Sequence, residues 1–135
     1  MREELSLPPQ ILNEADIRGN EYAWKLSCIP LVAQAARDEN LGILGGQVQV
    51  RFPDATCEFY WLNADPAPRK LGESWNTYVN RSYFEFIELY NKIILTADMN
   101  IEARHFDYLG KKIKDNLQIA DYTFFVLYFI NGESK

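Results

Sequence analysis

Histidine and cysteine are scarce in this sequence, which has one histidine, His105, and two cysteines, Cys28 and Cys57, among its 135 residues. Zinc sites are built from close clusters of Cys and His, and disulfide-stabilised domains need several cysteine pairs. The sequence has no CxxC motif and no Cys/His cluster, so we expect neither a metal site nor a bound cofactor. We expect both cysteines to be reduced and buried as small apolar side chains, although a bridge between them is compatible with the sequence.

Long apolar runs are also lacking. No stretch approaches the roughly 20 apolar residues that a membrane helix requires. The first ten residues, MREELSLPPQ, lack the apolar centre of a secretory signal. Hydrophobic residues nevertheless make up 47% of the chain, which is enough for a buried core, and the length suits one domain. We therefore expect a cytoplasmic protein with no membrane partner and a single domain over residues 1–135; the oligomeric state is left open.

Groups that could carry catalysis are few. His105 would have to serve any Ser/His/Asp or Cys/His device, yet it lies on a predicted polar helix and no GxSxG motif is present. The carboxylate pairs, such as Glu85 with Glu88, have the spacing of a solvated helix face. The sequence therefore predicts no catalytic residues and indicates a protein that is not an enzyme.

Basic residues are in the minority, and the imbalance is confined to one half of the chain. The net charge is −5, and residues 1–65 hold ten acidic and five basic residues, whereas the remainder is balanced. An acidic field repels nucleic acid and attracts a basic partner. Solubility alone is an equally simple explanation of the same charge.

The stretch at residues 41–62, LGILGGQVQVRFPDATCEFYWL, organises the predicted fold. Val48, Val50 and Phe52 alternate with polar residues, and alternation resumes at Cys57 after the turn-prone PDAT segment. A period of two places alternate side chains on opposite faces of a strand, so the stretch predicts a β-hairpin. Three glycines precede the first strand and predict a tight turn there, or a place where the backbone packs closely against a neighbour.

The rest of the chain predicts an α+β fold. Apolar spacing of three and four residues indicates helices at about residues 28–39, 75–95 and 101–117. The run DYTFFVLYFI at about residues 121–130 predicts a buried strand that joins the hairpin, at about residues 42–62, in an antiparallel sheet. Residues 1–20 are expected to be irregular, and residues 131–135 to form a loose tail.

Two short segments carry a resemblance to a known family. These are NEYAW at residues 20–24 and GILGGQV at residues 42–48, followed by Trp61 and by Ser74-Trp75. The pattern resembles that of a family of small bacterial immunity proteins encoded beside polymorphic toxins, immunity family forty. Gln47 departs from the family pattern, which has an aspartate there, so the resemblance supports no role for a carboxylate at that position. The resemblance spans residues 19–95.

The resemblance implies a protein that binds and neutralises a cognate bacterial toxin domain by occlusion, without catalysis. The acidic first half fits such a partner if the toxin is a basic nuclease. The candidate contacts are Glu58 and Tyr60 on the hairpin, with Asp65 nearby, and more weakly Glu14 and Asp16. Glu58 and Tyr60 could equally be part of the solvated face of a sheet.

Two other functions are compatible with the sequence. One is a small-molecule-binding or enzymatic domain with a pocket between the sheet and the helix that starts at Trp75, which would need convergent polar groups in an apolar cavity. The other is a housekeeping interaction module with no toxin partner. A toxin gene immediately upstream would favour immunity over both.

Overall fold

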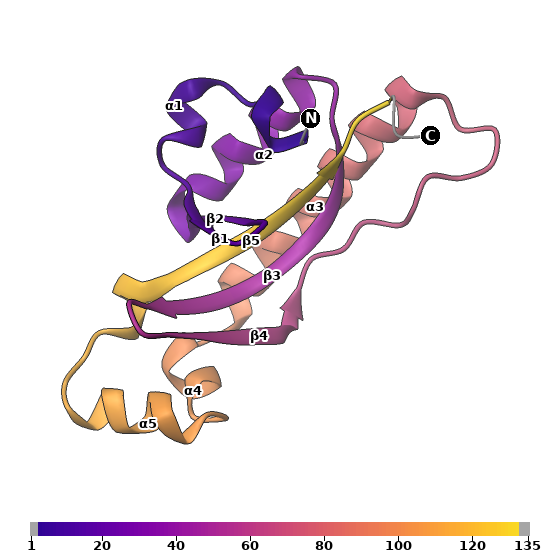
Figure 1. Ribbon diagram of the computed structural model, residues 1–135. Helices are drawn as coiled ribbons and strands as arrows, with labels where there is room; N and C mark the ends of the chain where they lie inside the picture. The colour runs from indigo at the N-terminus through magenta and orange to yellow at the C-terminus, as the bar shows by residue number, and fades with distance from the viewer. Residues whose placement is uncertain (1–2, 133–135) are drawn as a thin grey trace.

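The computed structural model describes residues 3–132 and places within them one five-stranded sheet (Figure 1). All neighbouring strands are antiparallel, in the spatial order β1-β2-β5-β3-β4. The strands are β1 (Asp16–Arg18), β2 (Glu21–Lys25), β3 (Gly42–Phe52), β4 (Ala55–Asn63) and β5 (Thr123–Ile130). The expected hairpin and C-terminal strand are confirmed, with a two-residue turn at Pro53 and Asp54 in place of the expected four.

The described residues also form helices, so the fold is α+β as expected. The α-helices are α1 (Pro9–Leu12), α2 (Ile29–Asp38), α3 (Trp75–Thr96), α4 (Met99–Ala103) and α5 (Asp107–Lys114). Short 3-10 turns lie at Glu3–Ser6, Leu26–Cys28 and Ile119–Tyr122. Helices α2 and α3 therefore match the helices expected at 28–39 and 75–95.

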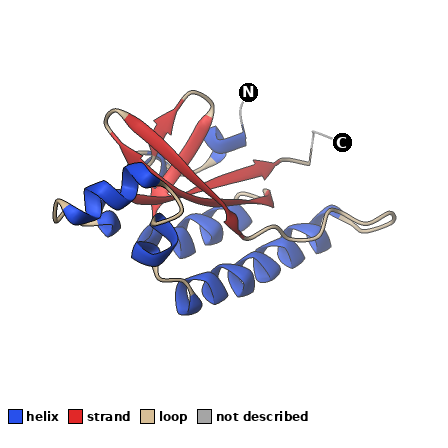
Figure 2. Ribbon diagram, turned by 90° about the horizontal axis from the view of Figure 1, so that it is seen from below, coloured by secondary structure: helices blue, strands red, loops and turns tan. Residues whose placement is uncertain are grey.

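The main core lies between the sheet and helices α2 and α3, which run along one face of the sheet (Figure 2). Phe125 on β5 meets the rings of Phe86 and Tyr90 on α3 edge-on, with centroids 5.7 and 5.3 Å apart. Val48 and Val50 on β3 are fully buried beside them. Burial of each such large apolar side chain contributes about 1.5–3 kcal/mol, so this face holds the sheet and helices together.

The three glycines expected in a turn lie inside β3 instead. Gly46 pairs with Leu127 on β5, and its α-carbon is so close to the Val126 carbonyl that a methyl group would overlap with the oxygen. Gly45 has φ +118°, in a register shift between β3 and β5. The turn prediction was wrong, because β3 already begins at Gly42. The alternative of close backbone packing is confirmed, because a methyl group at Gly45 or Gly46 would overlap with neighbouring backbone.

The edge strand β4 contains a three-residue bulge. Phe59 pairs with Val48, but the next pair joins Asn63 to Gln47, so residues 60–62 have no partner on β3. Bulges of this kind bend a strand and re-aim its side chains. Here the bulge leaves Tyr60 69% exposed, whereas Trp61 is half-buried.

The N-terminal segment is more regular than expected. A 3-10 turn, helix α1 and strand β1 occupy most of residues 3–18, and β1 forms a hairpin with β2 through Gly19, which has φ +60°. The buried Trp24 ring fixes the segment, because its Nε1 donates a hydrogen bond to the Ile11 carbonyl at 2.8 Å. These elements are three to five residues long, too short for periodicity to reveal.

The prediction of a single helix over residues 101–117 was also wrong, because the chain forms α4 and α5 with a break between them. Asp98 caps α4 by accepting hydrogen bonds from the backbone N–H groups of Asn100 and Ile101. Phe106 adopts an extended conformation at the break, and its ring stacks on Phe59 with centroids 5.6 Å apart. Tertiary packing of one aromatic side chain therefore overrides the helical spacing.

The described chain ends beside the start of α3. Asn131 and Gly132 are half-buried, and Gly132 lies next to the Trp75 ring. The rest of the predicted loose tail, residues 133–135, lies outside the described residues.

Candidate functional site

The face of the sheet opposite α2 and α3 carries a connected group of polar side chains, which we call the concave face. Its members are Asp16, Glu21, Gln47, Gln49, Arg51, Glu58 and Tyr128. The sheet curls strongly here, as a hydrogen bond between its two edge strands shows: Arg18 on β1 donates to the Thr56 hydroxyl on β4 at 2.8 Å. In a flat sheet these edge strands would lie about 19 Å apart, at ~4.8 Å per strand.

Arg51 lies at the centre of this curl, and its side chain is completely buried. Its guanidinium donates hydrogen bonds to Gln49 Oε1 at 2.9 Å, to the Asp16 backbone carbonyl at 2.8 Å and to Asp16 Oδ2 at 2.9 Å. The Nη2 atom has no hydrogen-bond partner among the described residues and lies 3.8 Å from Glu21 Oε1. The buried cation thus orients two carboxylates without being exposed itself.

Glu21 is fixed further by two neighbours. The Tyr128 hydroxyl donates to Glu21 Oε2 at 2.6 Å, and Gln49 Nε2 donates to Glu21 Oε1 at 3.3 Å. Burial, together with the hydrogen bond to Glu21, raises the pKa of Tyr128 to about 12, so the phenol remains protonated and acts as the donor. At the β4 side Gln47 Nε2 donates to Glu58 Oε1 at 2.5 Å.

The carboxylates of the concave face are more accessible than its central cation. The side chains of Asp16 and Glu21 are 38% and 37% exposed, Glu58 is exposed, and Arg51 is not. An approaching partner therefore meets oriented carboxylate oxygens, which accept hydrogen bonds from Lys and Arg side chains. Charge-assisted contacts of this kind are strongest where the acceptor is already held in place.

The structure brings together some of the predicted contact residues. Glu58 pairs with Gln49 across β3 and β4, Asp16 binds Arg51, and Tyr60 is exposed in the adjoining β4 bulge. Asp65 lies in the loop after β4, where its Oδ1 accepts a hydrogen bond from the Gly46 backbone N–H at 3.1 Å. Glu14 is exposed between α1 and β1, and no side-chain hydrogen bond joins it to the concave face within residues 3–132.

Sequence reasoning missed Glu21, Gln49, Arg51 and Tyr128 as members of this group. The alternation in β3 did place Gln49 and Arg51 on the face opposite Val48. It could not show that β1 folds over that face and buries both polar side chains. The only available signal was an arginine and two glutamines at alternate positions of one strand.

A second candidate region lies between β3 and the start of α3, where a pocket between sheet and helix was expected as an alternative. An apolar pocket of about 250 Å³ lies there, lined by Leu44, Pro68, Arg69, Trp75, Tyr78, Ile130 and Asn131. The Arg69 guanidinium packs over the Trp75 ring at 5.3 Å, and Trp75 Nε1 donates to the Asn40 carbonyl at 2.9 Å. The pocket suits an apolar group, and the polar groups that would orient a substrate do not converge on it.

A third polar group ties the loop at residues 64–74, called the clamped loop here, to α3. Arg81 donates to both Glu73 oxygens at 2.6 and 2.9 Å, and to both Glu85 oxygens at 3.1 Å. It also donates to the carbonyls of Ala67 and Pro68 at 3.1 and 3.0 Å. One guanidinium therefore fixes three points of the loop at once.

The contact between Arg81 and Glu73 makes stability depend on pH in acid solution. The hydrogen bond from Arg81 lowers the pKa of Glu73 to about 2, with a further contribution from the Lys70 backbone N–H. Because an unfolded glutamate has a pKa of about 4.3, this stabilisation is present above that pH and is lost as pH falls through 2. A titration of the Glu73 carboxyl carbon by NMR should have its midpoint near 2 and move upward in Arg81→Lys. A wild-type midpoint above 4 would contradict the clamp.

The remaining candidate groups lie outside these regions. His105 is exposed and meets the Trp61 ring edge-on, with centroids 4.9 Å apart. Both cysteines are free thiols; Cys57 is buried, which raises its pKa, whereas Cys28 is only half-buried. Among residues 3–132, no group of three or more His, Cys, Asp or Glu side chains could hold a metal ion.

The comparisons with known proteins identified no relative of this chain. Comparison of the chain with protein-family models, with curated proteins and with solved structures found no match. None of the helices in the described part of the chain is both long and apolar enough to span a membrane.

Proposed function

We propose that this chain is an immunity protein that binds a cognate bacterial toxin domain in the cytoplasm and neutralises it by occlusion, without catalysis. The observation that carries the proposal is the concave face, where buried Arg51 holds Asp16 and Glu21 beside exposed Glu58. The resemblance of residues 20–24 and 42–48 to immunity family forty supports the same function. The partner is a protein with a basic surface, and neither nucleic acid nor membrane is expected to bind.

The arrangement suits fast and specific association. The net charge of −5 steers a basic partner toward the chain before contact. On contact, carboxylates that are already oriented lose little conformational freedom, so more of the interaction energy appears as affinity. Tyr60, 69% exposed in the adjoining β4 bulge, provides a large amphipathic side chain of the kind that dominates binding energy.

The apolar pocket beside Trp75 is the one feature that bears on a second candidate, a small-molecule-binding domain, although it lacks the convergent polar groups that such a site needs. Its volume of about 250 Å³ lies below the range of typical ligand sites, which begins at about 300 Å³. A metabolite that stabilises the protein only when Trp75 is intact would favour this function. A housekeeping interaction module is the third candidate, and the absence of a toxin gene upstream would favour it.

Charge reversal at Glu58 tests the proposal. Glu58→Lys is expected to slow association with the C-terminal domain of the toxin encoded by the neighbouring gene by about 10-fold at low salt, because electrostatic steering is weakened. The matched control is Glu88→Lys, at an exposed position of α3, which changes net charge equally but lies away from the concave face. Stopped-flow association rates measure both variants.

The salt dependence provides a check on this interpretation, and two outcomes would count against the proposal. In about 1 M salt, where the Debye length is only about 3 Å, the two variants should converge with wild type. Equal slowing by Glu58→Lys and Glu88→Lys would show that net charge, and not the concave face, matters. Equal killing of cells that express the toxin domain with and without this protein would exclude immunity.

A further inference from the structure

The tip of the clamped loop carries the most exposed large apolar side chain among residues 3–132. Leu71 is fully exposed at 107%, and the next, Leu95, is exposed at 84%. Gly72 follows with φ +81°, so the chain reverses immediately after the leucine. Figure 1 shows the loop extending away from the sheet between β4 and α3.

Exposure of one leucine is ordinary, but the ordering of its loop is not. Besides the six hydrogen bonds of Arg81, Glu85 Oε1 accepts from the Ala67 N–H at 3.0 Å and Glu73 Oε1 accepts from the Lys70 N–H at 2.9 Å. Arg69 Nε donates to the Glu73 carbonyl at 3.0 Å. The loop is thus held in one shape before any partner arrives, which lowers the entropy lost on binding.

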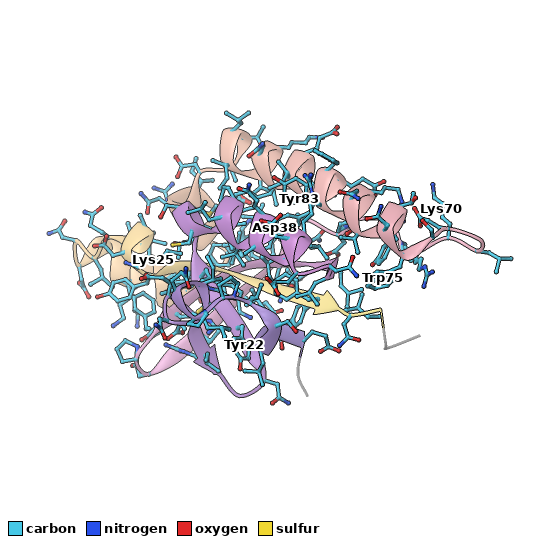
Figure 3. The ribbon with its side chains drawn as sticks, turned by 90° about the horizontal axis from the view of Figure 1, so that it is seen from above. Tyr22, Lys25, Asp38, Lys70, Trp75 and Tyr83 are labelled. Carbon is cyan, nitrogen blue, oxygen red and sulfur yellow. The ribbon has the colours of Figure 1, made fainter. Side chains whose placement is uncertain are left out.

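The charges next to Leu71 indicate which kind of binding surface would accept it. Arg69 and Lys70 precede it, and Lys70 is exposed and points away from the body of the protein in Figure 3. No ion pair holds the Lys70 side chain within the described chain. A single leucine beside two cations complements an apolar pocket with carboxylates at its rim. An anionic membrane fits less well, because one leucine buries little area and the chain carries −5 overall.

We propose that the clamped loop is a second contact with the toxin domain, and that Leu71 enters an apolar pocket whose rim carries carboxylates that face Arg69 and Lys70. This inference rests on the proposed function and extends it. The concave face meets a basic surface of the toxin, and the loop fills a separate acidic-rimmed pocket. Arg81 acts as a positioning residue, because it touches only the loop and α3.

Truncation of the leucine is the direct test. Leu71→Ala is expected to weaken binding to the toxin domain encoded by the neighbouring gene about 10- to 100-fold, the effect of exposing one buried leucine side chain. Leu95→Ala, at the end of α3, is the matched control and should bind within about twofold of wild type because truncation of an uninvolved surface side chain has little effect. Titration calorimetry measures both, and urea unfolding verifies that neither is destabilised.

The role of Arg81 in holding the clamped loop is tested by combining its substitution with that of Leu71. Arg81→Lys keeps the charge but cannot make all the hydrogen bonds of the guanidinium, so the loop should loosen. The variant should therefore be cleaved faster by trypsin after Arg69 and Lys70 and should bind the toxin more weakly. If Arg81 acts only by presenting the leucine, Arg81→Lys should weaken binding in wild type but not in Leu71→Ala. A purely structural role would produce the same loss of affinity in both backgrounds.

The outcomes separate the two proposals. If wild type binds the toxin domain and Leu71→Ala binds equally well, the loop contact is wrong and the proposed function stands. If wild type does not bind, the proposed function falls and the loop contact with it. Binding to phosphatidylcholine–phosphatidylserine vesicles that is lost in Leu71→Ala would show that the loop is a membrane contact, and would overturn the proposal.

Discussion

Replacing Gly46 with alanine should lower the free energy of unfolding by about 3 kcal/mol or more, or prevent folding. The added methyl group would overlap with the Val126 carbonyl oxygen, so β3 and β5 would have to separate where they pair most extensively. Overpacking against backbone cannot be relieved by a change of rotamer, which places this variant at the upper end of the usual range. Urea unfolding followed by circular dichroism measures the loss.

Two other glycines give a graded series for comparison. At Gly42 a methyl group would meet the buried ring of Tyr78, which is a side chain and not backbone, so Gly42→Ala should be less damaging than Gly46→Ala. At Gly110, inside α5, nothing lies within 4 Å, and alanine should stabilise the helix by up to about 1 kcal/mol. A Gly46→Ala variant as stable as Gly110→Ala would show that β3 and β5 are not in the register described.

Removal of the buried arginine should have the second-largest effect. Arg51→Ala is expected to lower the free energy of unfolding by about 2–4 kcal/mol, because breaking a buried charged pair by removing one partner is strongly destabilising. The variant also leaves the Gln49 amide oxygen and the Asp16 carbonyl without their donor. The loss falls below the maximum because Asp16 is 38% exposed and can be hydrated. Chemical denaturation at neutral pH measures it.

Arg104→Ala is the matched control for this variant. Arg104 is exposed at the end of α4, so its removal should change stability by less than about 0.5 kcal/mol. If Arg51→Ala also remained within that limit, the β1–β2 hairpin would not be folded over the concave face. Retention of toxin binding by Arg51→Ala would show, in addition, that its carboxylates need no support from the cation.

The sequence predicted elements where one face of a strand or helix is uniformly apolar. Val48 and Val50 revealed β3 because alternation is a local property of the chain. The burial of Arg51 could not be predicted in this way, since it depends on a contact with Asp16, 35 positions away in the sequence. Alternation separates the two faces of a strand but cannot distinguish a solvated polar face from an enclosed one.

The N-terminal segment and the break before α5 were missed for related reasons. Strand β1 has three residues, fewer than a period-two pattern needs, and it is stabilised by its neighbours. Phe106 has the spacing of a helical apolar stripe, but Phe59 and Trp61 bind its ring and draw the backbone out of the helix. The role of Glu58 and Tyr60 as contacts stays a prediction, for which their exposure is a necessary condition.

The bulge at residues 60–62 of β4 affects how copies of this chain meet one another. An unpaired edge strand can recruit the edge of another molecule and begin a growing fibril. Because three consecutive residues of β4 leave the regular ladder, a second strand could align with only part of this edge. The same distortion that exposes Tyr60 should therefore keep the protein from polymerising through β4 when it accumulates at high concentration.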